Sequence, residues 1–264
     1  MALPEPQAPH IFSPEYYRKL DRLEQRHPWS AHMQQLALVL IGRFCATPER
    51  VLDAGCGAGY FTALWREQSR PRLAVGIDAS FEGLGLCRGR GLQEVAAASV
   101  QALPLCSEIF DVIYCADVLQ HLSAPRAREA ISELARVLRP GGIVVIRAAA
   151  RRGIGSKKHR DTEDYQQWEP RKLAAYLEPY GFQVEWMSLV NWLPSLAADI
   201  RGYQKRAPAG DVGLQAAAGI PEGARGGVKG RLLAAYWAVE RFAVLRLGAR
   251  LPGGHTLLCV ARKR

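Results

Sequence analysis

The feature that most constrains the fold is the stretch VLDAGCGAGYFT at residues 51–62. Its apolar beginning predicts the end of a buried strand, and helical apolar spacing starts at Tyr60. Between them Gly55, Gly57 and Gly59 stand at alternate positions, so no side chain there keeps the backbone away from a ligand. A strand, a glycine turn and a helix N-terminus point bare N–H groups at a bound molecule. The stretch therefore predicts a nucleotide-binding βαβ unit.

Apolar runs and helical patterns alternate along the next hundred residues. Pro140, Gly141 and Gly142 are expected to end one helix and to turn the chain into a β-branched strand. Alternation of this kind predicts a doubly wound α/β sheet. The predicted strands cover residues 50–54, 73–78, 94–98, 110–116 and 142–148, and the predicted helices cover 59–68, 80–89 and 124–138.

Two further helices are predicted before this unit. Ser13 is the predicted N-cap of the first, and Pro14 occupies its first helical position. The second helix is expected to follow Trp29, to be capped by Ser30 and to end before Pro48. Both helices carry apolar residues at helical spacing, which indicates that they pack on the rest of the domain.

The segment AVGIDAS supplies a second binding motif. Its predicted strand ends at Asp78, 19 residues after Gly59. A dinucleotide fingerprint of the form G-x-G-x-x-G would require glycine at the position of Tyr60. A carboxylate at Asp78 can instead accept hydrogen bonds from both hydroxyls of an adenosyl ribose. The two motifs together favour an adenosyl ligand that is not a dinucleotide.

Five segments within residues 49–150 resemble, in order and spacing, those of the class I S-adenosylmethionine-dependent methyltransferases: VLDAGCGAG, GIDAS, ALPL, FDVIYCADVLQHL and ELARVLRPGG. The resemblance implies that S-adenosyl-L-methionine is the cofactor. Ser99 departs from the pattern, because the family often has an acidic residue there that contacts the adenine amine. The cofactor-binding residues implied are Asp53, Gly55, Gly57 and Gly59 around the methionine moiety with Tyr60 beside them, Asp78 and Ala79 at the ribose, Ser99 and Val100 at the adenine, and Cys115 in the fourth strand.

The same resemblance implies a Rossmann-like, doubly wound α/β fold with a seven-stranded sheet, an antiparallel last strand and a helical lid. EPRKLAAYLEPYGFQVEWMSLV resembles the helix and sixth strand of the family, and HTLLCVARKR resembles the seventh strand. We expect residues 1–48 to form an N-terminal helical lid, 49–150 the cofactor-binding core and 151–264 the C-terminal part of the same domain. A helical insertion at about 195–250 is expected to join the lid over the carboxyl edge of the sheet.

Methyl transfer from a sulfonium needs few polar groups, because the enzyme mainly aligns the acceptor and excludes water. His121, in VLQHL, follows the fourth predicted strand and is the candidate general base for a hydroxyl acceptor. The alternative is that this histidine packs at the start of the next helix. Tyr60, Phe61 or Trp29 either encloses the sulfonium or is an ordinary core aromatic.

Composition bounds the setting of the protein. The formal net charge is +10, and the excess of Lys and Arg lies almost entirely in residues 149–264. This basic third either attracts RNA, anionic lipid or an acidic substrate, or is a solvated face. The six cysteines are scattered without a CxxC pair, so we expect neither a metal site nor disulfides. No leader and no run of about 18 uncharged apolar residues is evident, so we expect a cytoplasmic protein without a membrane span.

Three function classes remain open. The leading one is an S-adenosylmethionine-dependent methyltransferase that O-methylates a small, amphipathic acceptor such as a natural product, a quinone or a sugar-bearing metabolite. The second is an RNA methyltransferase that uses the basic third, and the last is a non-catalytic cofactor-binding protein. The sequence has no added RNA-binding module and no signature for base methylation, so no nucleic-acid partner is expected. The acceptor, the methylated atom and the oligomeric state stay open.

Overall fold

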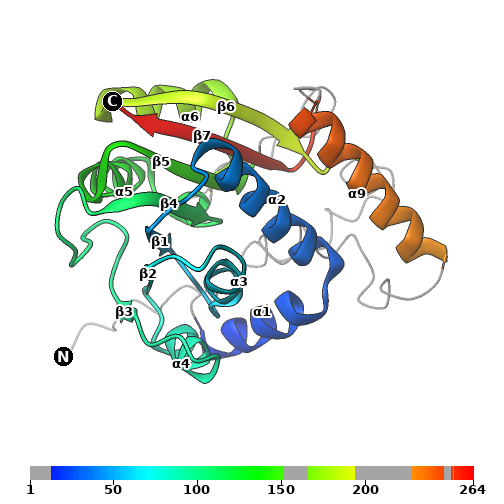
Figure 1. The fold of residues 1–264 in the computed structure, drawn as a ribbon, viewed down its shortest axis with the longest axis horizontal. Coiled ribbons are helices and arrows are strands. Elements are labelled where there is room, and N and C mark those ends of the chain that lie inside the picture. The colour runs from blue at the N-terminus through cyan, green and yellow to red at the C-terminus, as the bar shows by residue number, and fades with distance from the viewer. Residues whose placement is uncertain (1–12, 151–165, 194–227, 247–250, 252) are drawn as a thin grey trace, which may run out of the picture.

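The computed structural model describes residues 13–150, 166–193, 228–246, 251 and 253–264. Its centre is one seven-stranded sheet in the order β3-β2-β1-β4-β5-β7-β6 (Figure 1). The first five strands are parallel to one another, and β7 runs antiparallel to both of its neighbours, which confirms the predicted architecture. The strands are β1 (Arg50–Ala54), β2 (Leu73–Asp78), β3 (Val95–Ala97), β4 (Phe110–Ala116), β5 (Leu138–Ala149), β6 (Phe182–Val190) and β7 (Thr256–Lys263).

Helices cover the sheet on both faces, so that three layers enclose two apolar cores (Figure 1). The core on one face includes side chains of α5 (Ala124–Val137) and α6 (Pro170–Leu177). The core on the other face includes side chains of α2 (Pro28–Phe44), α3 (Tyr60–Ser69) and α9 (Val228–Arg246). The remaining helices are α1 (Pro14–Arg26), α4 (Phe81–Gly89) and the 3₁₀ turns η2 (Leu119–His121) and η3 (Glu178–Tyr180).

The central strands are buried on both faces, as expected of parallel strands between helical layers. Successive side chains of a strand point to opposite faces, so Val144 enters the core beneath α5 while Val145 enters the core beneath α2. The parallel strands β1, β2 and β4 end at one edge of the sheet, where their terminal side chains and the loops after them gather. This edge is where the fold positions a ligand site.

The two N-terminal helices form, with one correction to the predicted boundaries. Ser13 caps α1 as predicted, since its side chain accepts the Tyr16 N–H at 3.3 Å. The prediction that α2 starts after Trp29 with Ser30 as its cap is wrong. The helix begins at Pro28, and His27 Nδ1 accepts the Trp29 N–H at 3.2 Å. Proline at the first helical position has a preset φ angle, which fixes the earlier start.

The boundary between α5 and β5 also differs from the prediction. Residues 140–142 were expected to form the turn before the strand, but β5 already starts at Leu138 and includes them. Leu138 pairs with Phe110, and a register shift between Phe110 and Val112 absorbs the extra residues. Gly141, at φ +77°, supplies the left-handed backbone in this irregular stretch.

The C-terminal third contains the predicted helix of the insertion. In α9, Trp237 and Leu245 are buried against the core on the α2 side, whereas Phe242 is exposed. The glycine-rich part of the predicted insertion lies outside the described residues, and the domain boundaries stay predictions. No helix within the described residues combines the length and the hydropathy that a membrane span requires.

Candidate functional site

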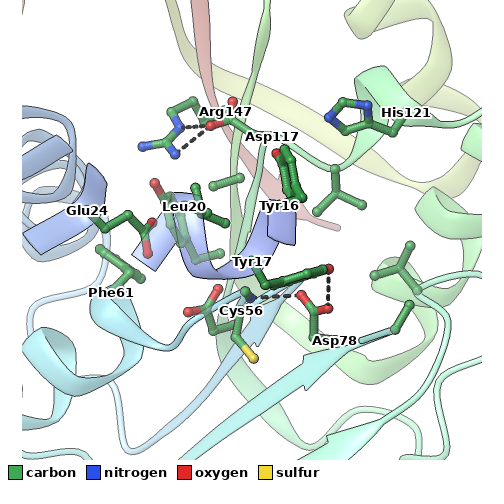
Figure 2. Close-up of a pocket in the computed structure, with 18 of the residues that line it drawn as sticks. Tyr16, Tyr17, Leu20, Glu24, Cys56, Phe61, Asp78, Asp117, His121 and Arg147 are labelled. Carbon is green, nitrogen blue, oxygen red and sulfur yellow. Dashed lines mark hydrogen bonds and ion pairs between the residues drawn. The ribbon is translucent and has the colours of Figure 1, made fainter. Parts of the chain in front are cut away.

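A cavity of about 300 Å³ lies at the carboxyl edge of the sheet (Figure 2). Its floor is formed by the ends of β1, β2 and β4 and the loops that follow them, and α1 together with the start of α2 forms one wall. The lining residues are Tyr16, Tyr17, Leu20, Leu23, Glu24, Trp29, Ser30, Gln34, Asp53, Gly55, Cys56, Gly57, Phe61, Asp78, Ala79, Ala98, Ser99, Val100, Gln101, Tyr114, Ala116, Asp117, Val118, His121, Leu122, Arg126 and Arg147.

Asp78 is the centre of the polar floor. Its Oδ2 accepts the Gly57 N–H at 2.8 Å, and its Oδ1 accepts the Ser80 N–H at 2.9 Å. The hydroxyl of Tyr17, from α1, donates a third hydrogen bond to Oδ1 at 2.9 Å (Figure 2). Burial, and then the nearby Asp78 carboxylate, raises the pKa of Tyr17, so its hydroxyl stays a donor at neutral pH. The helical wall is thus tied directly to the predicted ribose-binding carboxylate.

The glycine turn adopts a backbone that other residues rarely take. Gly55 and Gly57 have φ values of +88° and +55°. A Cβ on Gly55 would lie 2.2 Å from Cγ2 of Val118, which follows β4. The turn therefore needs glycine for two reasons, its left-handed backbone and the close approach of a neighbouring loop.

Asp53 lies at the end of β1 and is almost fully buried. The hydroxyl of Thr62 donates to its Oδ2 at 2.6 Å. Burial raises the pKa of Asp53 to about 7, although the bond from Thr62 opposes the shift. This carboxyl therefore titrates near neutral pH.

An ion pair lines the cavity where β4 and β5 end. Nε and Nη2 of Arg147 donate to Oδ2 of Asp117 at 3.0 and 2.6 Å (Figure 2). Asp117 itself sits at φ +57°, and its N–H donates to the Arg147 carbonyl. The guanidinium carbon also lies 5.5 Å from the ring centroid of Trp29. Arg147 thus presents a fixed cation beside an aromatic surface.

Glu24, from α1, brings a second acidic side chain to the same cavity. Its Oε2 is buried and has no hydrogen-bond partner among the described residues. Burial raises the pKa of Glu24 to about 8, while Arg147 opposes and Asp53 reinforces the shift. Sequence reasoning missed Glu24 and Tyr17, since a charged residue and a tyrosine on an amphipathic helix are ordinary surface and packing residues. The single available signal was their position in the helix expected to form the lid.

His121 ends η2 and lines the cavity, on the side away from Glu24 (Figure 2). Burial lowers the pKa of this imidazole, and the nearby Asp117 opposes the shift. The ring is therefore neutral at pH 7 and has a nitrogen that can accept a proton. Its role as a general base stays a prediction.

The cavity brings together eight of the predicted site residues: Asp53, Gly55, Gly57, Asp78, Ala79, Ser99, Val100 and His121. Three others lie outside its lining. A Cβ on Gly59 would contact Cys87 and Leu92 of the neighbouring α4 region. The Tyr60 ring lies beneath the Arg90 guanidinium, 3.8 Å from its carbon. The Cys115 side chain lies in the apolar core beneath α5 and not in the cavity lining, because successive side chains alternate along β4.

Metal-ligating side chains do not gather here. Within the part of the chain that the structure describes, no three His, Cys, Asp or Glu side chains lie close enough to hold a metal ion. Among the charged side chains that line the cavity, Asp53, Asp78, Asp117 and Arg147 are hydrogen-bonded within the described residues, whereas the buried Oε2 of Glu24 is not.

Sequence comparison relates this chain to methyltransferases. A family model described as a methyltransferase domain matches residues 52–146. A tRNA (carboxymethyluridine(34)-5-O)-methyltransferase from Arabidopsis thaliana is 34% identical over 131 residues, which are 49% of this chain and 30% of that protein. A malonyl-[acyl-carrier protein] O-methyltransferase from Salmonella typhimurium is 35% identical over 48% of this chain and 49% of its own length. A fatty-acid O-methyltransferase from Mycolicibacterium smegmatis is 37% identical over 36% of this chain and 35% of its own length. The chain spans half or less of each of these relatives.

Solved structures share the fold over nearly the whole chain. The [4+2]-cyclase SpnF superposes with a TM-score of 0.59 at 20% identity and covers 98% of this chain and 97% of its own. Phosphoethanolamine N-methyltransferase 2 of Haemonchus contortus, in complex with S-adenosyl-L-methionine, has a TM-score of 0.59 at 16% identity. The superposition covers 96% of this chain and 58% of that protein chain. At these identities the likeness shows the fold alone.

The groups that line the cavity suit the chemical parts of S-adenosylmethionine. Asp78 offers carboxylate oxygens to hydroxyl donors, Gly57 keeps the adjacent backbone free of side chains, and Glu24 has an unpartnered buried oxygen opposite which a positive charge can lie. These features agree with the matched family and with the order of the sheet. The chain therefore contains a class I S-adenosylmethionine-dependent methyltransferase domain, whose cofactor is S-adenosylmethionine.

Proposed function

We propose that the protein transfers a methyl group from S-adenosylmethionine to an oxygen of a small amphipathic acid. The observation that carries this proposal is Arg147, a charged side chain only 11% exposed in the cavity wall. Its Nε and Nη2 bind Asp117, and no hydrogen bond within the described residues engages Nη1. An arginine of this kind suits a carboxylate, which it binds with charge-assisted hydrogen bonds.

The cofactor end of the cavity is assigned to the floor. Asp78 would bind the ribose hydroxyls, Gly55 and Gly57 would let the backbone approach the methionine moiety, and Ser99 with Val100 would border the adenine. Gly59, Tyr60 and Cys115 would act indirectly, by packing behind this surface. Bound cofactor supplies an electrophilic methyl group, and the protein's part is to align the acceptor and exclude water.

The acceptor end is assigned to the region between Arg147 and α1. Trp29, Leu20 and Tyr114 give this region apolar and aromatic surface, which suits the hydrocarbon part of an amphipathic acid. A carboxylate is already ionised at neutral pH and needs no general base. His121 would then matter only for a hydroxyl acceptor, where removal of a base lowers the rate by about 10²–10⁴-fold.

The substrates named for the relatives support a carboxylic acid as the acceptor. Malonyl, fatty-acid and carboxymethyl groups each carry a carboxyl function, and all three names describe methylation of oxygen. The organisms and the rest of the substrates differ, so the shared chemistry is the acid. For this chain that chemistry is part of the proposal, because the alignments cover half or less of those proteins.

RNA methylation is the second candidate, and the relative from Arabidopsis thaliana favours it. In that case a single nucleotide would have to enter beside α1, and the basic third of the chain would bind phosphates. Binding would then weaken steeply with salt, because each neutralised phosphate releases a counterion. Little salt dependence and no methyl transfer to tRNA would exclude it in favour of the small acid.

Methyl transfer from radiolabelled S-adenosylmethionine tests the proposal. The acceptors are saturated fatty acids of several lengths, a malonyl thioester, fatty alcohols of matched length and bulk tRNA. We expect label in base-labile methyl esters of the acids and at least tenfold less transfer to the alcohols. Cofactor binding without transfer to any of these acceptors would favour the non-catalytic alternative and contradict the proposal.

A paired substitution isolates the role of Arg147. Arg147→Gln combined with Asp117→Asn removes both charges and leaves no unpaired ion, so we expect KM for the acid to rise about 10–100-fold while cofactor affinity changes little. Arg139→Gln combined with Asp111→Asn is the matched control, because this arginine–aspartate pair lies outside the cavity lining. Equal effects of the two changes would show that Arg147 does not hold the acceptor.

A further inference from the structure

Glu24 stands out among the charged groups of the cavity because its buried Oε2 has no hydrogen-bond partner within the described residues. The residue lies near the end of α1 and lines the cavity, as Phe61 does (Figure 2). Its buried Oε2 has no partner, although the described chain offers two arginines in the neighbourhood. A buried carboxyl group without a partner stays protonated unless a positive charge stabilises its ionised form.

The groups that face Glu24 explain why it stays unpaired. Arg147 of β5 is engaged by Asp117, which follows β4. Arg90, after α4, is engaged by Asp21 and by the carbonyl of Ala58. Asp53 of β1 is a second acid and repels a charge on Glu24. Arg90 is therefore bound to other partners, and Arg147, whose Nε and Nη2 bind Asp117, donates no hydrogen bond to the buried Oε2 of Glu24.

The consequence is a carboxyl that binds its proton until a cation arrives. Burial raises the pKa of Glu24 to about 8, so most of the ligand-free protein carries a neutral Glu24 at pH 7. A positive charge brought into the cavity favours the ionised form and lowers that pKa. Binding of a cation would then release a proton, whereas a neutral ligand would not.

We propose that Glu24 is the charge partner of the cofactor's sulfonium and thereby distinguishes S-adenosylmethionine from its demethylated product, S-adenosylhomocysteine. The proposal rests on the proposed function, because it concerns the same cavity. The two ligands share the adenosyl and amino-acid groups and differ by one methyl group and one positive charge. A carboxylate opposite the sulfur therefore selects the substrate form and does not hold the product form.

The reaction itself changes the charge that Glu24 faces. The S–CH₃ bond breaks with its electron pair staying on sulfur, and an oxygen lone pair of the acid forms the new O–CH₃ bond. Glu24 then faces a neutral thioether and takes up one proton from solvent. The site thus returns to its uncharged state, which favours release of the product.

Titration calorimetry with S-adenosylmethionine and S-adenosylhomocysteine tests this inference between pH 6 and pH 9. For the wild type we expect affinity for S-adenosylmethionine to rise up to about tenfold per pH unit as pH approaches 8 and then to level off. Affinity for S-adenosylhomocysteine should stay nearly constant. Buffers of different ionisation enthalpy should show proton release at pH 7.5 for the first ligand and much less for the second.

Glu24→Gln provides the variant, and Glu15→Gln provides the control. Glu15 lies on the same helix but is exposed and pairs with Arg18, so its loss removes a charge without changing the cavity. At pH 8.5 we expect Glu24→Gln to reduce the preference for S-adenosylmethionine at least tenfold and Glu15→Gln to preserve it. A residual slope near pH 7 in Glu24→Gln is expected from Asp53, whose pKa is about 7.

The outcomes separate this inference from the proposed function. Wild-type binding of both ligands with equal proton release, or an unchanged preference in a folded Glu24→Gln variant, overturns the role of Glu24 alone. Absence of binding of either ligand to the wild type overturns the proposed function as well. The wild-type proton count needs no variant, so equal proton release with the two ligands overturns the role of Glu24 even where Glu24→Gln fails to fold.

Discussion

The floor and the helical wall of the cavity are built on different principles. In the floor, Asp78 accepts hydrogen bonds from Gly57, Ser80 and Tyr17, and Asp53 accepts one from Thr62. In the wall, Glu24 has a buried oxygen without any partner among the described residues. The two carboxylates of the floor are thus hydrogen-bonded within the protein, whereas the carboxyl of the wall has an oxygen that is not. This contrast predicts that recognition of the adenosyl group and recognition of charge are separable in this protein.

The largest effect is expected from a side chain placed in the glycine turn of the floor. Gly55→Ala combines a left-handed backbone, at φ +88°, with a Cβ 2.2 Å from Val118 Cγ2. Strain and overpacking each cost about 1–3 kcal/mol, so we expect a loss of about 2–6 kcal/mol in the free energy of unfolding. Denaturant titration of the two proteins measures it.

Gly85→Ala is the control for this prediction. Gly85 lies inside α4, and a Cβ there would meet nothing within 4 Å. Alanine in an open helical position should stabilise the protein by about 0.5–1 kcal/mol. Similar destabilisation by both substitutions would mean that the turn is not the rigid floor described above.

The second prediction removes the floor's carboxylate. We expect Asp78→Ala to weaken S-adenosylmethionine binding by about 1.5–3 kcal/mol, because charged hydrogen bonds to the ribose are lost. S-adenosylhomocysteine should lose the same amount, since it has the same ribose. Calorimetry with both ligands checks this, and a loss confined to one of them would show that Asp78 senses charge as the wall does.

The third prediction is that replacing Glu24 stabilises the protein, whereas the two substitutions above reduce its stability or its ligand affinity. The pKa of Glu24 is about 8 in the folded protein and 4.5 ordinarily, so the native state binds more protons between these values. Stability from this group is therefore lost as pH rises from about 4.5 to about 8. Glu24→Gln removes the buried charge and should stabilise the ligand-free protein by about 1–3 kcal/mol at pH 8.5 and by almost nothing at pH 4.

Melting curves at the two pH values measure this effect. Asp53 adds a slope of the same sign, because burial raises its pKa to about 7, and that slope stays in the variant. A Glu24→Gln protein that is less stable than the wild type at pH 8.5 would mean that the carboxylate has a partner in solution. The carboxyl group of the wall would then be hydrogen-bonded, as the carboxylates of the floor are.

The smallest expected effect lies at the contact between wall and floor. The Tyr17 hydroxyl donates to Asp78 Oδ1, an oxygen that the ribose is proposed to use. Tyr17→Phe removes this competing donor, and a net hydrogen bond contributes about 0.5–1.5 kcal/mol. We expect S-adenosylmethionine to bind a few-fold more tightly. Weaker binding would show that the tyrosine contacts the ligand and does not compete with it.

The floor could be predicted from the sequence because its parts lie in short motifs. Asp53, the glycines and Asp78 each end a strand whose apolar pattern is visible in the chain, and parallel strands end at one edge of a sheet. The seven-stranded sheet with an antiparallel last strand followed from the resemblance of the same motifs to a known family, and the structure confirms it.

The wall could not be predicted, because its chemistry depends on packing between distant segments. Tyr17 and Asp78 are 61 residues apart, and nothing in the helical pattern around Glu24 indicates that its carboxyl is buried. Tyr60 and Cys115 show the converse. Their positions in the motifs suggested the cavity, but the direction of the side chain along α3 and β4 takes each of them elsewhere.

A crystal structure with bound S-adenosylhomocysteine is the decisive measurement, because it places the ligand against both regions of the cavity at once. We expect the ribose hydroxyls to lie within about 3 Å of the Asp78 carboxylate. We also expect the thioether sulfur on the side of the cavity that Glu24 faces, with α1 covering the ligand. A ligand bound outside this cavity, or a ribose directed away from Asp78, would show that the floor and the wall do not have the roles proposed for them.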